Sequence, residues 1–133
     1  MTVKPSTEKT RLDPVSVSVL TLMVPGLGHL AMGRAAKGLL FMLLVTGTFF
    51  AGWLIGDRQV VFFGPGRWHV FVQLATGVTA LATALRGHPP ADPGFLVSYR
   101  PEIGTLYTMV AGLLNVLVIM DAVVTNLRIR RTS

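Results

Sequence analysis

The feature that most constrains this chain is an unbroken run of 19 residues, 38–56, that contains no Asp, Glu, Lys or Arg. As an α-helix this run is about 28 Å long, which is enough to cross the hydrocarbon core of a bilayer. Charges return directly after it, at Asp57 and Arg58. The run therefore predicts a transmembrane helix.

Three further apolar runs cover 14–33, 68–85 and 103–127, and the charges gather between them. Only 14% of the residues are charged, whereas soluble domains average about 25%. Backbone groups in lipid must be satisfied within their own segment, which favours helices over isolated strands. We therefore predict an all-α integral membrane bundle of about four transmembrane helices. It forms a single domain, 14–127, between a polar tail at 1–13 and a basic tail at 128–133.

The first run is interrupted by Pro25 and Gly26, which kink or end helices. We expect its helix to be short or broken there, so that it either crosses fully or dips into the membrane and returns. A basic tail before an apolar core is also typical of a signal peptide. Asp13 and Pro14 at the start of the core, and the lack of a clean small-x-small site, argue against cleavage.

The Lys and Arg positions predict the side on which the termini lie. With four crossings, both tails and the 57–67 turn share a side and hold eight of these residues, against four opposite. Cytoplasmic loops are enriched in Lys and Arg, so both termini are expected in the cytoplasm of a bacterial inner membrane. If the first run dips and returns, the ratio is seven to five and the bias is weak. The charges flank apolar runs, which indicates the lipid bilayer and not nucleic acid as the partner.

Small residues recur every four positions in the later runs, as at Gly104, Thr108 and Gly112. Such stripes let helix backbones approach closely, and buried polar side chains can bond across the contact. The pattern predicts packing against other membrane helices or against a second copy of the chain.

Gln73, Asn115 and Asp121 are the polar residues that could form a site inside the membrane. An intramembrane carboxylate suggests function by default, for example as a proton or cation carrier. The alternative is that Asp121 already lies at the interface and pairs with Arg128 or Arg131.

The turn after the break at Pro25 offers a second candidate site. Its backbone groups and basic side chains could hold a phosphate or a lipid headgroup. The alternative is a turn that needs glycine for its backbone angles, with basic residues at the headgroups. The residues concerned are Gly26, Gly28, His29, Arg34 and Lys37.

No catalytic constellation is found in the sequence. There is no cysteine, no Ser/His/Asp or paired-carboxylate spacing and no phosphate-binding loop. His29 and His69 could share a metal only if they were close, and four crossings place them at opposite ends of their helices. We therefore expect no enzymatic activity, cofactor or metal.

Residues 24–41 carry the pattern P-G-x-G-[H/Q]-x-x-x-G-x-x-x-[K/R]-G. This box resembles one found in small uncharacterised bacterial multi-pass membrane proteins, and it is distantly similar to the turn of the TM-two domain. Residues 104–121 resemble the last helix of an uncharacterised bacterial family that has this box. The resemblance implies a membrane protein and indicates no activity.

These observations predict a small polytopic inner-membrane protein that acts as a non-enzymatic accessory or scaffold subunit. The alternative is an oligomeric transporter or channel component that uses Asp121, Asn115 and Gln73.

Overall fold

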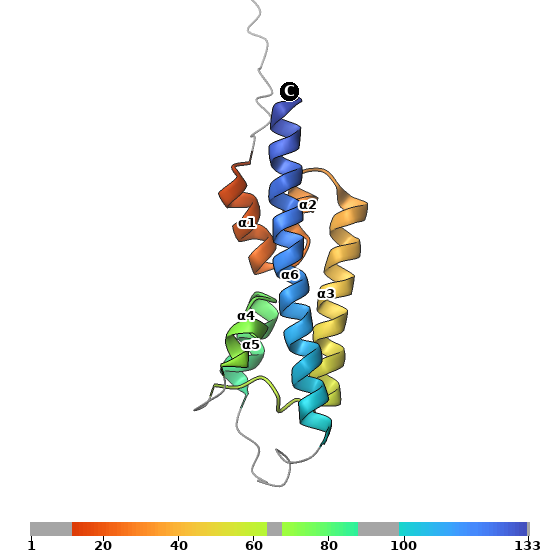
Figure 1. Cartoon of the computed structure of the whole chain (residues 1–133), viewed down its shortest axis with the longest axis vertical. Coiled ribbons are helices and arrows are strands. Elements are labelled where there is room, and N and C mark those ends of the chain that lie inside the picture. Colours follow the sequence, from red (N-terminus) through yellow and green to blue (C-terminus); the bar gives the residue numbers. More distant parts are fainter. Residues whose placement is uncertain (1–11, 64–67, 88–98, 133) are drawn as a thin grey trace, which may run out of the picture.

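The computed structural model describes residues 12–63, 68–87 and 99–132, and these residues form six α-helices and no strand. The predicted all-α class is therefore confirmed. Two long helices run antiparallel and side by side, and the short helices pack beside them as two pairs (Figure 1). The helices are α1 (Pro14–Met23), α2 (Leu27–Ala31), α3 (Ala35–Ile55), α4 (His69–Leu74), α5 (Val78–Arg86) and α6 (Tyr99–Arg131).

Among the described residues, only α3 and α6 are long and apolar enough to cross a membrane, so four full crossings are not confirmed. The 21 residues of α3 extend about 32 Å and the 33 residues of α6 about 50 Å. The two helices approach closely at Gly52 and Gly104, where a Cβ on either glycine would overlap the backbone of the other helix. The small-residue pattern thus identifies a real contact within this chain.

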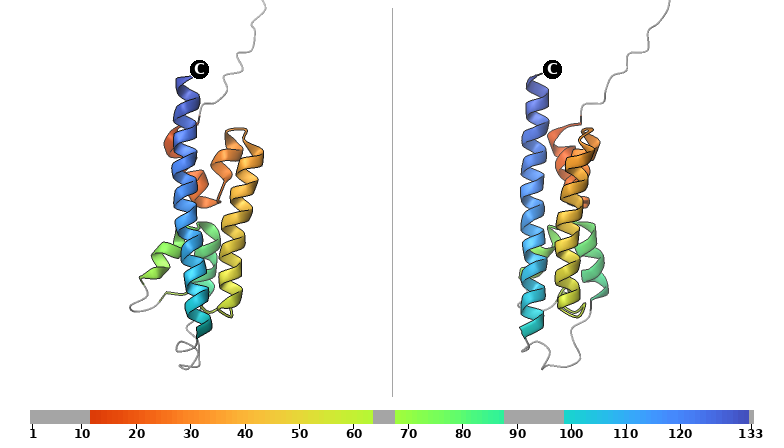
Figure 2. Two further views of the ribbon diagram at one scale, coloured as in Figure 1. Left: turned by 45° about the vertical axis from the view of Figure 1, so that its right-hand side comes forward. Right: turned by 90° about the vertical axis from the view of Figure 1, so that its right-hand side faces the viewer.

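The first apolar run forms a hairpin of two short helices. Its break lies at Pro25 and Gly26, as predicted, between α1 and α2. Gly26 has φ 83°, a left-handed conformation that favours glycine. A side chain there would also overlap the carbonyl group of Gly38 on α3. The chain descends along α1 and returns through α2 to the start of α3 (Figures 1 and 2).

The third apolar run predicts one continuous helix over 68–85, and this prediction is wrong. The run is split into α4 and α5, and Gly77 between them has φ 87°. A Cβ on Gly77 would overlap the carbonyl oxygens of Leu22 and Met23 at the end of α1. The break is therefore part of a tertiary contact, in which the tips of two hairpins from opposite ends of the molecule meet (Figure 2).

The predicted bounds of the last helix and of the tails also change. α6 begins before residue 103 and continues through 128–131, which were expected to form a tail. Residues 1–11 of the predicted N-terminal tail lie outside the described residues. Leu12 lies against the other terminus, because its carbonyl oxygen accepts hydrogen bonds from Asn126 Nδ2 (3.0 Å) and from Arg130 (3.1 Å).

Apolar side chains cover much of the outside, and several polar side chains are buried among apolar ones inside. Only 22% of the most apolar 18-residue stretch of α3 and 39% of that of α6 is buried. Such extensive exposed apolar surface is unusual for a soluble monomer. A small apolar cluster around Val45, Phe49 and Ala111 joins α3 to α6. The fully buried polar side chains are Thr21, His29, Gln73, Thr76, Thr108 and Asn115.

Candidate functional site

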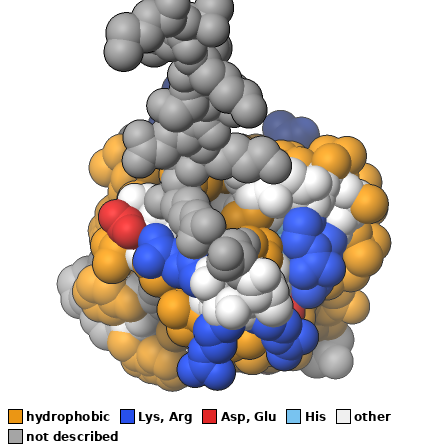
Figure 3. All heavy atoms as spheres, turned by 90° about the horizontal axis from the view of Figure 1, so that it is seen from above, with side chains coloured by type: hydrophobic (Ala, Val, Ile, Leu, Met, Phe, Trp, Pro, Cys, Tyr) orange, Lys and Arg blue, Asp and Glu red, His pale blue; other side chains and the backbone are white. Residues whose placement is uncertain are grey.

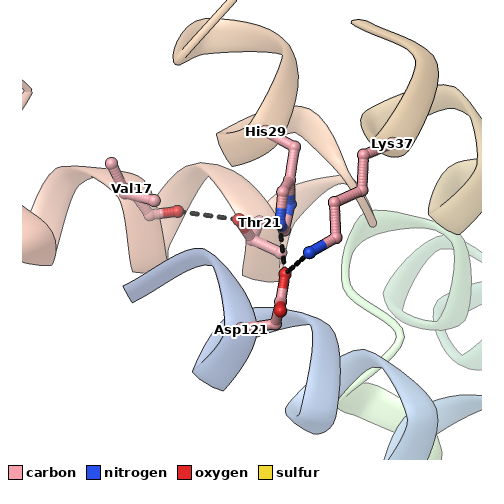
Figure 4. A network of polar contacts seen from close by, with 5 residues as sticks. All are labelled: Val17, Thr21, His29, Lys37 and Asp121. Carbon is pink, nitrogen blue, oxygen red and sulfur yellow. Dashed lines mark hydrogen bonds and ion pairs between the residues drawn. The ribbon is translucent and has the colours of Figure 1, made fainter. Parts of the chain in front are cut away.

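Three charged or titratable side chains from three helices meet near the end of the molecule that holds the C-terminus (Figure 4). Nε2 of His29, on α2, lies 2.7 Å from Oδ2 of Asp121, on α6. Nζ of Lys37, on α3, lies 2.6 Å from the same oxygen. One carboxylate therefore joins the first hairpin to both long helices. We call these three residues the ion cluster.

The glycines of the box bring the helices of the ion cluster together. Gly28, the residue before His29, has no room for a Cβ, which would overlap Thr21 Oγ1 on α1. Gly38, the residue after Lys37, is limited in the same way by the carbonyl oxygen of Gly26. His29 and Lys37 are thus each next to a glycine that allows close packing of the backbone there. This explains the spacing of the box through packing.

The members of the ion cluster differ in exposure. The side chain of His29 is 0% exposed, that of Lys37 31% and that of Asp121 40%. The ring of Phe41 lies near both nitrogen-bearing side chains: its centroid is 5.1 Å from the imidazole centroid and 5.5 Å from Lys37 Nζ. An aromatic face near an ammonium group adds a favourable cation–π contact. The cluster is therefore open to the solvent on one side and closed by the first hairpin on the other.

The tautomer of His29 follows from its contacts. Because a carboxylate oxygen only accepts hydrogen bonds, Nε2 must carry the proton that faces Asp121. The other ring nitrogen, Nδ1, is buried, and no described residue hydrogen-bonds to it.

The structure regroups the residues that the sequence assigned to two sites. His29 and Lys37 of the predicted anion turn bind Asp121 of the predicted intramembrane site. The expectation that Asp121 pairs with Arg128 or Arg131 is wrong, since its partners come from α2 and α3. Arg34, in contrast, is exposed at the start of α3. Any external anion at this turn would compete with the carboxylate that is already there.

Gln73 and Asn115 form a separate buried layer further along α6. Gln73 Nε2 donates a hydrogen bond to Thr108 Oγ1 (2.7 Å), which joins α4 to α6. Asn115 Nδ2 donates to the carbonyl oxygens of Ala75 (2.7 Å) and Thr21 (3.3 Å). Asp121 is six positions beyond Asn115, about 9 Å along the helix axis. Gln73 contacts α6 at Thr108, seven positions or about 10.5 Å before Asn115, so the three predicted polar residues lie at three levels along α6.

Sequence reasoning missed Thr21 and Thr76 as members of this layer. Neither lies in a polar motif, and the carbonyl oxygen of Thr21 became relevant only because α1 ends there. The sequence did contain a signal for Thr108, because it precedes Asn115 by seven positions and therefore lies on the same face of the helix.

His69 lies at the start of α4, in the second hairpin, and His29 lies in the first. It lines an open pocket of about 370 Å³ beside the first turns of α6, together with Gln59, Glu102 and Thr105. Within the described part of the chain, no three His, Asp or Glu side chains are grouped so that they could hold a metal ion.

The model of a protein family of unknown function, DUF6677, matches residues 16–133. The chain belongs to this family. The DUF6677 match begins inside α1 and includes the ion cluster, the buried amide layer and both hairpins. Comparison with curated proteins and with solved structures finds no match. The similarity to the TM-two domain is not confirmed.

Proposed function

We propose that this chain is an integral membrane protein in which α3 and α6 cross the bilayer and the two hairpins enter it from opposite sides. The distribution of side chains supports this proposal. Large apolar side chains such as Leu43, 77% exposed, cover the outside of the long helices, while polar side chains such as Gln73 and Asn115 are buried inside. Lipid accepts such a surface, whereas in water it would be a large exposed apolar patch.

The two-crossing arrangement changes the predicted side of two loops and keeps the predicted side of the termini. The start of α1 and the end of α6 lie at the same end of the molecule (Figure 1). Lys and Arg side chains surround that end (Figure 3). The positive-inside rule then places it in the cytoplasm of a bacterial inner membrane. Of the described residues, it carries Arg34, Lys37, Arg128, Arg130 and Arg131, against Arg58, Arg86 and Arg100 at the opposite end.

The role that the geometry supports best is that of a non-enzymatic accessory or scaffold subunit. One observation carries this proposal: the polar side chains available for chemistry instead join helices of the chain. Asp121 joins α6 to α2 and α3, and Asn115 joins α6 to the ends of α1 and α4. The outward faces of α3 and α6 remain for lipid and for helices of other proteins.

Photo-crosslinking in native membranes tests this role. A photoreactive amino acid replaces Leu43 on α3 or Leu117 on α6, both exposed, and Asp57 in the turn after α3 is the control outside the apolar faces. A scaffold subunit should give a protein adduct of one discrete mass from at least one helix position. If both helix positions give lipid adducts only, the scaffold role is rejected.

A transporter or channel component is the second candidate, and the two interrupted helices favour it. In many transporters, discontinuous helices meet near the middle of the bilayer at the substrate or ion site. Here a hairpin followed by a long helix occurs twice, in opposite orientations (Figure 2). The packing does not repeat, however, because α1 and α4 both pack on α6. Proton-coupled flux in proteoliposomes that is abolished by Asp121→Asn would favour this candidate over the scaffold.

A further inference from the structure

The C-terminal ends of α1 and α4 meet at Asn115, near the middle of α6. Asn115 Nδ2 donates a hydrogen bond to one carbonyl oxygen from each end, those of Thr21 and Ala75. Gly77, just after α4, lies directly against two further carbonyl oxygens at the end of α1. We call this place, where the two helix ends face each other beside Asn115, the junction.

The junction gathers negative partial charge. The C-terminal end of a helix carries partial negative charge, and its last carbonyl groups have no partner within the helix. Two such ends that face each other repel, and the repulsion is stronger away from water. At the break after α1, backbone N–H groups donate to the carbonyl oxygens of Leu20 and Val24. They do not donate to those of Leu22 and Met23, which lie beside Gly77. Asn115 offsets only part of this charge, because its amide group is neutral.

Two side-chain oxygens at the junction also need a partner. They are Oδ1 of Asn115 and Oγ1 of Thr76, the residue between Ala75 and Gly77, and no described residue hydrogen-bonds to either of them. Both side chains are 0% exposed. Nδ2 of Asn115 is held by two carbonyl oxygens, which only accept, so its amide cannot be flipped to relieve Oδ1. Buried acceptors without a partner are costly, and each such group in a structure calls for an explanation.

We propose that the junction binds one Na⁺ ion. Amide, hydroxyl and carbonyl oxygens are the ligands that hard cations prefer. These ligands carry no formal charge, which favours a monovalent ion over a divalent one that would require carboxylates. The nearest acid along α6, Asp121, is already bound by His29 and Lys37. A cation between the two helix ends would offset their repulsion, as ions do at the ends of interrupted helices in transporters.

Thermal unfolding of the full chain in detergent tests the site. NaCl is compared with KCl and with N-methylglucamine chloride at equal ionic strength. At a Na⁺ concentration about ten times Kd, a single site should raise Tm by about 5 °C. Thr76→Val removes one oxygen at nearly constant shape and should abolish the Na⁺-specific rise. Thr83→Val is the matched control, since Thr83 bonds only to carbonyls of its own helix, and should keep the rise.

Three results would overturn the proposal. An equal rise in Tm with N-methylglucamine would show charge screening. No rise in Tm with any salt would mean that the junction is dry or filled by water. A full Na⁺-specific rise in Thr76→Val would place the ion elsewhere. If Thr76→Val does not fold, equilibrium binding of radioactive Na⁺ to the wild type decides, with one ion per chain expected and none overturning the site. None of these results depends on whether the chain is a scaffold subunit, so the two proposals fail independently.

Discussion

Oδ2 of Asp121 lies 2.7 Å from Nε2 of His29, a residue 92 positions earlier in the chain. This contact closes the first hairpin against the last helix, and Lys37 completes it from α3. The carboxylate is the only negative group in the cluster. Removal of its charge leaves Lys37 without an ion-pair partner and the imidazole without an anionic acceptor.

Asp121→Asn should therefore destabilise the protein by about 1–3 kcal/mol, which is the usual cost when a charged hydrogen-bond partner is removed. Thermal unfolding in detergent measures the effect. Asp13→Asn is the matched control, because Asp13 forms an ion pair with Arg130 of α6 at an exposed site. Exposed pairs contribute about 0–1 kcal/mol. Equal Tm values for the two variants would contradict a role of Asp121 in holding the hairpin.

Two glycines of α3 should respond in opposite directions to the same substitution. Gly52→Ala places a methyl group against the backbone of α6 at Gly104, so the helices must separate, at about 1–3 kcal/mol. Gly47→Ala meets open space and should be neutral or stabilising by up to about 1 kcal/mol, because alanine favours helix. Urea or thermal unfolding of both variants checks this. A destabilised Gly47→Ala with a neutral Gly52→Ala would refute the packing of α3 on α6.

Asn115→Leu should loosen both hairpins at once. It keeps the side chain large but leaves the carbonyl oxygens of Thr21 and Ala75 without their donor, at about 1–3 kcal/mol each. Hydrogen exchange should then show faster exchange in α1 and in α4, with α3 unchanged. A variant in which only one hairpin loses protection would show that Asn115 does not connect the two.

The absence of cysteine makes the topology directly testable. Single cysteines at Ala36 and at Gln59 lie at opposite ends of α3. With two crossings, a membrane-impermeant maleimide added to spheroplasts should label Gln59→Cys and should not label Ala36→Cys until the membrane is opened. Four crossings with cytoplasmic termini require the reverse, so labelling of Ala36→Cys alone would reject the arrangement proposed here.

The features that the sequence predicts correctly depend on short-range causes. The long helix after Lys37 follows from a charge-free run of sufficient length, and the first break follows from Pro25. The break at Gly77 has no such cause, because its conformation is fixed by contact with Leu22 and Met23 from a distant part of the chain.

The ion cluster was missed for a related reason. If the first run crosses fully, His29 lies at the outer end of its helix and Asp121 near the inner end of the last one. Only the return of the chain through α2 brings the two residues to the same level. The assumption that the first run crosses fully therefore separates His29, and the basic residues that follow it, from Asp121. The sequence singles out His29 and Lys37 at the turn, but it does not identify Asp121 as their partner.

The paired hairpins also bear on how the chain is inserted during synthesis. A first hairpin that turns back leaves Arg34 and Lys37 on the side of the ribosome, so neither cation has to be translocated. In the proposed arrangement only the stretch between α3 and α6 has to pass through the membrane, in one event, and its three arginines, Arg58, Arg67 and Arg86, pass with it. The end of α1 has no partner until the second hairpin and α6 arrive. We therefore expect the two halves to be assembled within the bilayer after translation of α6, and not helix by helix as each leaves the translocon.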